Sequence, residues 1–145
     1  MHVIQKKLYT FALIIVALLA INCSSRNRSQ KTTDEIFHER FVSNAQSLNK
    51  QCPIQVDEIT TFKNVVVSGN KMMIKTVIKE DFIGQVDFDF FKLKMASNYS
   101  RLLDKEFVNY IDKNKYYIEY VIMDEHDNAI RTIEISGRDI MNSNN

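Results

Sequence analysis

The chain has 145 residues, with 19 Lys and Arg against 18 Asp and Glu and a formal net charge of +1 at pH 7. This even balance argues against a nucleic-acid-binding protein, whose affinity comes largely from basic side chains that neutralise phosphates. The length is sufficient for one hydrophobic core that needs no metal or disulfide cross-link.

The N-terminal segment has the pattern of an export signal. Two lysines, Lys6 and Lys7, precede an apolar run from Leu8 to Ile21, and polar residues follow it. A charged head, a short apolar segment and a small-residue exit are typical of a signal peptide. The run has 14 residues, whereas a helix needs about 20 to span a bilayer. We therefore expect residues 1–22 to be a cleaved signal peptide, with a retained single-pass anchor as the alternative.

The segment Leu19-Ala20-Ile21-Asn22-Cys23 resembles a lipobox, where bacterial lipoproteins are acylated on cysteine and cut just before it. The resemblance implies a palmitate-type lipid on Cys23 and attachment to a membrane of the cell envelope, on its periplasmic or surface side. Asn22 stands where Gly, Ala or Ser is usual, and Ala20 where Leu is usual. Cleavage nearby without lipidation, or no cleavage, remain alternatives.

Residues 23–33 are expected to form the lipidated cysteine and a polar tether. The stretch SSRNRSQKTTD contains no apolar residue, so it cannot pack into a core. We expect one globular domain over residues 34–140 and a disordered tail over 141–145. Without residues 1–22 the count is 17 basic against 18 acidic residues, or a net charge of −1. With Cys23 acylated, Cys52 has no disulfide partner, and we expect it to be a small buried residue rather than a reactive thiol.

The first expected helix covers residues 33–49. Thr32 and Glu35 have the spacing of a capping box. Apolar residues follow at helical spacing and share one face: Phe37, Phe41, Ala45 and Leu48.

Two β-branched runs, residues 56–67 and 72–78, flank Ser68-Gly69-Asn70. A short gap with Gly and Asn between such runs predicts a β-hairpin. In the second strand we expect the face that carries Lys75 and Lys79 to lie nearer water.

A second helical region should begin at Asp87 or Asp89. Its apolar residues keep helical spacing, but Asn98 and Ser100 weaken the middle, so we expect two shorter helices with Asp104 near the start of the second. A final hairpin is predicted from residues 116–122 and 129–136. The turn between them spans residues 124–128, and Asn128 suits a positive φ there.

The expected order is α-β-β-α-β-β. Two hairpins, each preceded by a helix, predict an α+β fold of two layers, in which a four-stranded antiparallel sheet has helices on one face. The opposite face of such a sheet can stay open. A protein partner is expected to dock on that open face, through an apolar or aromatic patch. The charged residues expected there, Lys75, Lys79, Glu119 and Arg131, would argue against docking if they stood alone.

Two stretches resemble an uncharacterised family of small bacterial exported proteins or lipoproteins. The first is Asn49-Lys50, Pro53-Ile54, Val56-Asp57 and then Thr60. The second is the Tyr-rich strand 116–124 with the returning strand 130–135. The resemblance spans residues 36–140 and implies the domain outline, with no assigned activity. Asn128 replaces a usual glycine, and Ile140 replaces a late cysteine of some members, so a disulfide there is absent.

No residue pattern predicts a catalytic centre, a metal site or a cofactor. Asp124-Glu125-His126-Asp127 gathers carboxylates and an imidazole, but a hairpin tip is usually a solvated turn. His38 lies beside the apolar face of the first helix and is expected to be a boundary residue. Asp57 and Thr60 should satisfy backbone N–H groups at the start of the first strand, and a recognition role is the alternative for both.

Three functional hypotheses follow. The first is a non-catalytic envelope lipoprotein that binds a protein partner. The second is a small ligand-binding or enzymatic domain with a pocket between helices and sheet, which a packed layer around Phe91 and Tyr99 would exclude. The third is a subunit of a membrane complex that keeps residues 8–21 as its anchor. Partner, substrate, oligomeric state and membrane leaflet are not specified by the sequence.

Overall fold

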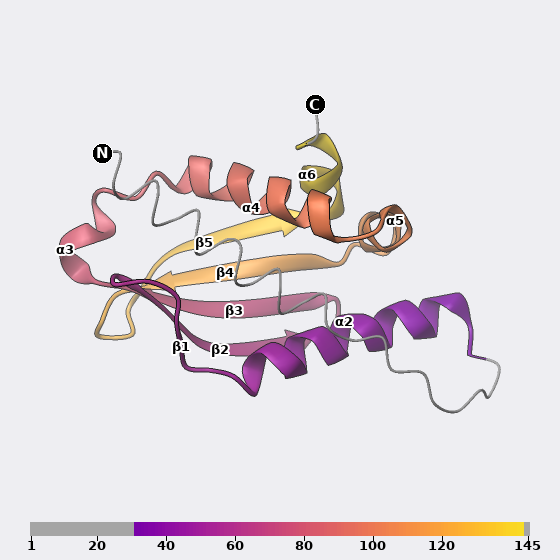
Figure 1. Ribbon diagram of the computed structural model, residues 1–145, viewed down its shortest axis with the longest axis horizontal. Coiled ribbons are helices and arrows are strands. Elements are labelled where there is room, and N and C mark those ends of the chain that lie inside the picture. Colours follow the sequence, from indigo (N-terminus) through magenta and orange to yellow (C-terminus); the bar gives the residue numbers. More distant parts are fainter. Residues whose placement is uncertain (1–30, 144–145) are drawn as a thin grey trace.

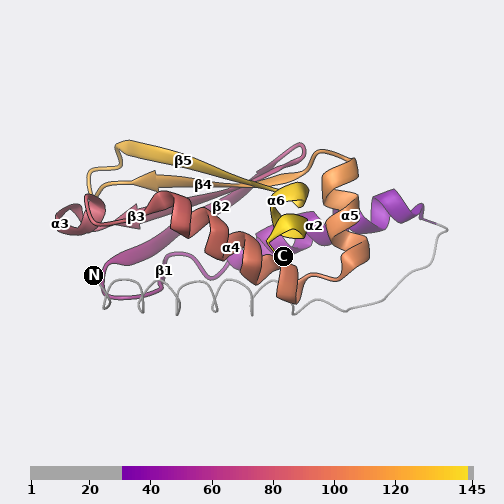
Figure 2. The same ribbon diagram turned by 90° about the horizontal axis from the view of Figure 1, so that it is seen from above.

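The computed structural model describes residues 31–143. A five-stranded sheet in the order β1-β2-β3-β4-β5 forms one layer, and helices α2, α4, α5 and α6 lie on one side of it (Figures 1 and 2). The strands are β1 (Ile54–Gln55), β2 (Thr60–Ser68), β3 (Lys71–Ile78), β4 (Tyr117–Met123) and β5 (Ala129–Ser136). The helices are α2 (Thr33–Asn49), α3 (Glu80–Ile83), α4 (Phe88–Leu102), α5 (Lys105–Lys113) and α6 (Gly137–Asn142).

Helix α2 has the predicted bounds and the predicted capping box. The Thr32 side chain accepts a hydrogen bond from the Glu35 N–H, and the Glu35 carboxylate accepts one from the Thr32 N–H. These contacts satisfy N–H groups that the first turn leaves without helical partners. Phe41, Ala45 and Leu48 are buried on the face toward the sheet, and Phe37 packs half-buried beside them.

The first predicted hairpin is confirmed, with Gly69 at φ +60° in its turn. Strand β2 begins at Thr60 rather than at Val56, because the preceding residues form a turn. In that turn the Val56 N–H donates to the Thr60 carbonyl at 3.0 Å. The added strand β1, which sequence patterns missed, is two residues long and pairs only with Thr61 and Phe62.

The predicted division of the second helical region is also confirmed. Asp87 caps α4 by accepting from the Phe90 N–H at 2.9 Å, and Asp104 caps α5 by accepting from the Phe107 N–H at 2.8 Å. Between them Leu103 is extended. The short helices α3 and α6 were not predicted, and α6 continues to Asn142, within the stretch assigned to a tail.

The second hairpin, β4–β5, forms as predicted, but its turn differs in one detail. Asp127, not Asn128, has the positive φ, at +65°. Asn128 instead uses its side-chain amide to donate to Asp124, 2.8 Å away. A short polar side chain tolerates the left-handed region, which explains why Asp127 can take that position.

The sheet is mixed, so the prediction of an antiparallel sheet is wrong for its central pair. Strands β3 and β4 run parallel, with Lys71 opposite Tyr117 and Val77 opposite Met123, whereas the other pairs are antiparallel. The reason is the connection between them: α3, α4 and α5 carry the chain back to the end where β3 began. A crossover of this kind is what parallel neighbours require, and a hairpin count alone does not reveal it.

One face of the sheet holds the core. Along β3, Met72, Ile74, Thr76 and Ile78 are buried toward the helices, while the alternate residues are half-buried. The lysine-bearing face of β3 is thus nearer water, as expected. No helix within residues 31–143 is long and apolar enough to cross a membrane; the predicted signal or anchor lies outside the described residues.

Candidate functional site

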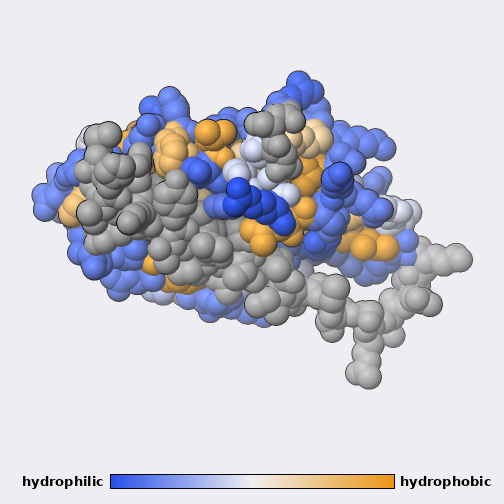
Figure 3. Space-filling model, turned by 45° about the horizontal axis from the view of Figure 1, so that its top comes forward, coloured by the Kyte–Doolittle hydropathy of each residue, from blue (hydrophilic) through white to orange (hydrophobic). Residues whose placement is uncertain are grey.

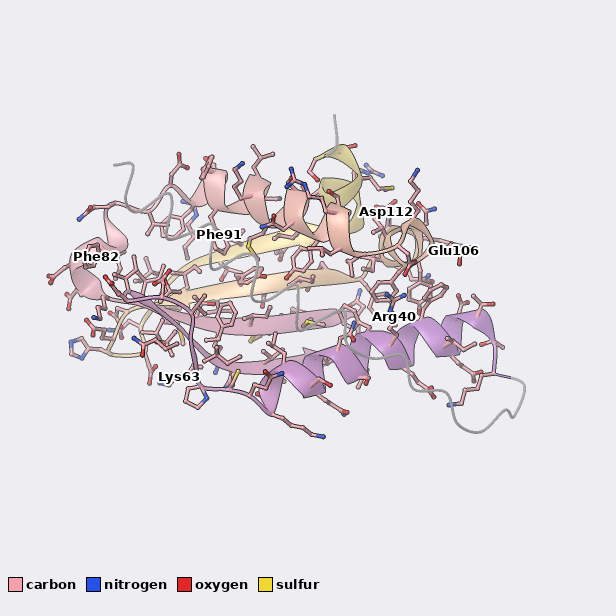
Figure 4. The ribbon with its side chains drawn as sticks, viewed as in Figure 1. Arg40, Lys63, Phe82, Phe91, Glu106 and Asp112 are labelled. Atoms are coloured by element: carbon pink, nitrogen blue, oxygen red, sulfur yellow. The ribbon has the colours of Figure 1, made fainter. Side chains whose placement is uncertain are left out.

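Side chains fill the space between α4 and the sheet. Phe91, which points from α4 toward the strands (Figure 4), is 4% exposed, and Tyr99 and Tyr120 are 0% exposed. The ring of Phe91 meets the Tyr120 ring edge-on, with centroids 5.3 Å apart. This is the packed layer that argues against a ligand pocket at Phe91 and Tyr99.

The buried tyrosines of α4 and β4 form a hydroxyl pair. The two oxygens of Tyr99 and Tyr120 are 2.5 Å apart, so one hydroxyl donates to the other. Burial raises the pKa of both phenols, because the charged phenolate would lie in a medium of low polarity. Both stay protonated at neutral pH, and their role is to satisfy each other inside the core.

A groove of about 340 Å³ runs between α2 and the outer edge of β2. We call it the α2–β2 groove. Its apolar wall consists of Val42, Ala45, Val65 and Val67, and its rim carries His38, Gln46, Asn49 and Gly69. Across it, the Asn49 side chain accepts a hydrogen bond from the Val65 N–H at 2.9 Å. None of the lining side chains carries a fixed charge, so the groove suits an apolar or neutral polar occupant.

An aromatic cluster holds α2 in place next to this groove. The rings of Phe37 and Tyr110 stack with centroids 5.0 Å apart, and Phe41 meets Tyr116 edge-on at 4.9 Å. His38, an exposed boundary residue as predicted, hydrogen-bonds the Tyr116 hydroxyl through Nδ1 at 2.7 Å. These contacts tie α2 to α5 and to Tyr116 just before β4, so the helical wall of the groove is supported by the core.

Helix α2 is also linked to α5 by an ion pair. Arg40, where the two helices approach in Figure 4, donates to the Asp104 carboxylate at 2.6 Å and lies over the Phe107 ring at 4.4 Å. Burial alone would raise the pKa of Asp104, but hydrogen bonds from Arg40 and from the Phe107 N–H outweigh it and lower that pKa. One carboxylate therefore serves both the cap of α5 and the contact to α2.

A second, polar cavity of about 480 Å³ lies at the end of the sheet, where the β2–β3 turn, the start of β4 and the start of α6 meet. Its lining includes the basic residues Lys92, Lys115 and Arg138 and the acidic residues Asp112, Glu134 and Asp139. Lys92 and Asp139 pair at 3.2 Å. The opposite charges lie together, so this cavity has no net preference for an anion or a cation.

The open face of the sheet alternates apolar and charged side chains. Val66 is 49% exposed there, and Met73 and Val121 are half-buried. Glu119 is almost buried and pairs with Lys71 at 3.1 Å, and their hydrogen bond raises the pKa of Lys71. Lys75 shares this face, as predicted. Figure 3 views the molecule from the helix side instead, where the side chains that are not grey are mainly hydrophilic with hydrophobic ones in separate patches.

Arg131 was predicted on the open face, and that prediction is wrong. In the register Arg131 lies opposite Ile122, a buried residue on the helix side. Its guanidinium is 5.5 Å from the centre of the Phe88 ring and 3.7 Å from Asp89. Arg131 is in step with Ile133 and Ile135, which are buried toward the helices, so the regular alternation of the strand puts its side chain on the helix side.

The predicted recognition residues lie in the turn before β2. Asp57 Oδ1 accepts from the Ile59 N–H at 2.8 Å, while Oδ2 is buried without a partner in the described chain. Thr60 is 5% exposed, and its carbonyl accepts from Val56. The structure thus places Asp57 in the expected local backbone contact. Its recognition role stays a prediction, and neither residue lines the α2–β2 groove.

The acidic β4–β5 turn forms local contacts. Asp124 Oδ1 accepts from the N–H groups of His126 and Asn128, each at 2.8 Å. The hydrogen bonds from the side chain and then the backbone of Asn128, with the one from His126, lower the pKa of Asp124. Asp127 pairs with Lys63, which lies at the same end of the sheet (Figure 4). Within residues 31–143 no group of three or more His, Cys, Asp or Glu side chains is arranged to hold a metal ion.

Of the two cysteines, Cys52 is half-buried, and its thiol donates to the Leu48 carbonyl at 3.5 Å. Burial raises the pKa of the Cys52 thiol, which disfavours the reactive thiolate. The predicted lipid-attachment residue, Cys23, lies outside the described residues.

Sequence reasoning missed the α2–β2 groove. Its components were visible separately: a capped amphipathic helix and an uncharged run, Val65-Val66-Val67. Their juxtaposition depends on β1 being only two residues long, which leaves most of the outer edge of β2 beside α2. A strand of two residues is too short to show an alternation of apolar and polar residues in the sequence.

No protein-family model matches the sequence, and no curated protein is significantly similar to it. Solved structures do share the fold. One is a predicted secreted protein of Pseudomonas aeruginosa, with a TM-score of 0.59 and 9% identity over 77% of this chain and 99% of that one. Another is EpsS, the pilotin of the Vibrio vulnificus type 2 secretion system, with a TM-score of 0.56 and 15% identity over 74% and 94%.

A third is the type II secretion system pilotin AspS of Vibrio cholerae, with a TM-score of 0.54 and 8% identity over 73% of this chain and 94% of that chain. Identities this low establish a common fold and do not assign an activity. The fold of residues 31–143 is thus shared with one protein described as secreted and with two type II secretion pilotins.

Proposed function

We propose that this protein is an envelope lipoprotein without catalytic activity, which binds a protein partner through the α2–β2 groove. The carrying observation is the groove itself, a neutral and apolar cleft beside an incompletely covered strand. Residues 1–22 would export the chain, and Cys23 would carry the lipid that anchors it. The fold shared with pilotins supports this proposal, because those proteins belong to secretion systems.

The groove is preferred over the open face of the sheet as the docking surface. Protein interfaces have centres depleted of charged residues. The groove wall has none, whereas the open face carries Lys71, Lys75 and Glu119 among its apolar residues. A partner that covered the open face would bury those charges at a cost in desolvation.

Binding at the groove is tested by site-specific photocrosslinking in intact cells. A photoreactive amino acid at Gln46, an exposed rim residue, should trap one envelope protein. The same amino acid at Thr132, exposed on the opposite strand β5, is the matched control and should trap little of it. Equal capture from both positions, or none from either, would contradict the proposal.

The membrane anchor is tested by the intact mass of the protein extracted from membranes. Cleavage before Cys23 with acylation predicts loss of residues 1–22 and a mass increase from the lipid. The variant Cys23→Ser should be unmodified and released from the membrane fraction. Retention of the whole N-terminus would instead support the third hypothesis, a complex subunit with an uncleaved anchor.

A small-ligand function is the second candidate, and the sheet-end cavity is the feature that favours it. Its six charged side chains converge on one hollow of about 480 Å³, which is within the usual size range of ligand sites. A panel of zwitterionic metabolites tests this candidate by its effect on the melting temperature of the protein. A compound that raises the melting temperature of the wild type but not that of Lys115→Ala would support it.

A further inference from the structure

Strand β2 has an outer edge that the rest of the described chain leaves mostly uncovered. Strand β1 pairs with Thr61 and Phe62 alone. Beyond them the order of the sheet places no strand outside β2 within residues 31–143. The segment Asn64–Ser68 is therefore paired on one side, with β3, and borders the α2–β2 groove on the other.

The direction of the backbone groups along this edge follows from one hydrogen bond. The Val65 N–H donates to the Asn49 side chain on α2 and therefore points away from β3. Backbone groups alternate in direction along an antiparallel strand. The N–H and C=O of Val67 consequently point the same way as those of Val65, toward the groove. Of these outward groups, the Val65 N–H is the one that pairs with Asn49.

The two outer edges of the sheet differ in how they are protected. Natural proteins block free edges with charged side chains, bulges or short strands, because free edges recruit other chains. Strand β5 carries Arg131 and Glu134, and β2 has a bulge with Lys63 at its covered end. The free part of β2, residues 64–68, carries no charge at all. This part of the edge lacks the usual protection.

The α2–β2 groove complements the unpaired edge. A strand added beside β2 would point every second side chain to the helix side of the sheet. There it would meet Val42 and Ala45 of α2 and the side chains of Val65 and Val67. The edge supplies hydrogen bonds to a peptide backbone, and the groove supplies apolar contact for alternate side chains, which together are the requirements of β-strand addition.

We propose that the partner of this protein binds as an extended segment, which adds to β2 as an extra strand antiparallel or parallel to residues 64–68. This inference rests on the proposed protein-binding function and deepens it. The recognised segment is about five residues long, has apolar side chains at alternate positions, and belongs to an envelope protein. Its backbone receives a hydrogen bond from the Val67 N–H and donates to the carbonyls of Val65 and Val67.

The probe is a peptide defined by crosslinking. The partner peptide trapped from Gln46 in intact cells is sequenced by mass spectrometry and synthesised, and its affinity for the wild-type protein is measured by calorimetry. A series of the same peptide is then made with one backbone N-methyl group at each position in turn. Because the protein is unchanged in this series, the result does not depend on whether a variant folds.

β-strand addition predicts an alternating pattern in that series. N-methylation at every second position should weaken binding about tenfold or more, because it removes a donor to β2, and the intervening positions should tolerate it. A uniform loss across the segment would indicate a helical ligand, and no loss anywhere would indicate side-chain contacts alone. Either result overturns strand addition but leaves protein binding at the groove intact.

Variants of the protein test the same edge. Val67→Pro removes the outward N–H, at a place where an edge strand tolerates proline, and should weaken binding of the peptide about tenfold. Val67→Lys adds the missing protective charge and should also weaken it, whereas Thr132→Lys on β5 is the matched control and should not. If Val67→Lys and Thr132→Lys weaken binding of the peptide equally, the inference is overturned.

Two further outcomes are distinguishable. If Gln46 traps only a second copy of this chain, and the protein dimerises unless Val67 is replaced by proline, the edge serves self-association and the proposed partner is wrong. If no position on the protein traps any protein, the proposed function fails and strand addition fails with it.

Discussion

At the scale of single residues, the buried hydroxyl pair of Tyr99 and Tyr120 is a defined determinant of stability. Tyr99→Phe leaves the Tyr120 oxygen buried without its partner, so we expect the free energy of unfolding to fall by about 1–3 kcal/mol. The double variant Tyr99→Phe/Tyr120→Phe removes both polar groups and should recover part of that loss. Urea unfolding of the wild type, Tyr99→Phe, Tyr120→Phe and the double variant measures the coupling energy. Strictly additive losses would show that the two hydroxyls do not stabilise the protein jointly.

The same two residues predict a dependence of stability on alkaline pH. Burial raises their pKa in the folded protein above the value of about 10 that tyrosine has when unfolded. Their contribution is therefore intact below pH 10. Above it the unfolded chain loses protons first, and stability falls by about 1.4 kcal/mol per pH unit for each tyrosine. Between pH 10 and pH 11 the stability of the double variant should fall less steeply with pH than that of the wild type. Some decrease should remain in the double variant, because burial also raises the pKa of Tyr110.

Gly137 is required by a close approach to α5. A Cβ built on it would lie 2.5 Å from the backbone nitrogen of Asp112. We expect Gly137→Ala to cost about 1–3 kcal/mol, because the backbone of α5 or α6 must shift. Gly84→Ala is the matched control, since nothing lies within 4 Å of that position. Comparable melting temperatures for both variants would contradict this packing.

At the scale of elements, Asp104 joins the start of α5 to α2. Asp104→Ala removes both the cap and the ion pair to Arg40, and we expect a loss of about 1–2 kcal/mol. Asp104→Asn keeps a capping oxygen and should lose less than half as much stability as Asp104→Ala, because the exposed ion pair contributes little. Unfolding in urea compares them; an equal loss in both variants would assign the effect to the charge.

Elements with their own periodic signal were predictable from the sequence. Helix α2 has both its capping box and its apolar stripe, and the two hairpins have turn residues between β-branched runs. The parallel pairing of β3 with β4 was not predictable in this way, because it depends on where three consecutive helices return the chain. Strand β1 and helices α3 and α6 are too short for any periodicity. The face of Arg131, by contrast, follows from its alternation with Ile133 and Ile135 and was predictable from the sequence.

The candidate site illustrates the same division. His38 at a boundary and the Asp57 backbone contact were correctly inferred from neighbouring residues, whereas Cys52, expected to be buried, is half-buried. The α2–β2 groove was not, because it requires knowing that the outer edge of β2 is free after Phe62 and that α2 lies along it. The absence of charge in residues 64–68 indicates a binding site only once this part of β2 is known to lie at the edge of the sheet.

At the scale of the whole molecule, residues 31–143 form a domain with helices on one side of its sheet, which we propose is exported and anchored by a lipid. The aromatic cluster of α2, α5 and Tyr116 holds the helical wall of the groove, and β3 holds the strand wall. A partner can thus bind to surfaces that are already in place, which limits the entropy lost on binding. Affinity should therefore depend more on contacts within the groove than on rearrangement of the fold.

The most direct measurement of the central claim is amide hydrogen exchange on the protein with and without the crosslinked partner peptide. Binding at the α2–β2 groove predicts added protection in β2, greatest at the outward N–H of Val67, and in the second half of α2, with β5 and the sheet-end cavity unchanged. Protection centred on the open face of the sheet, on β5 or on the sheet-end cavity, with β2 unaffected, would contradict it.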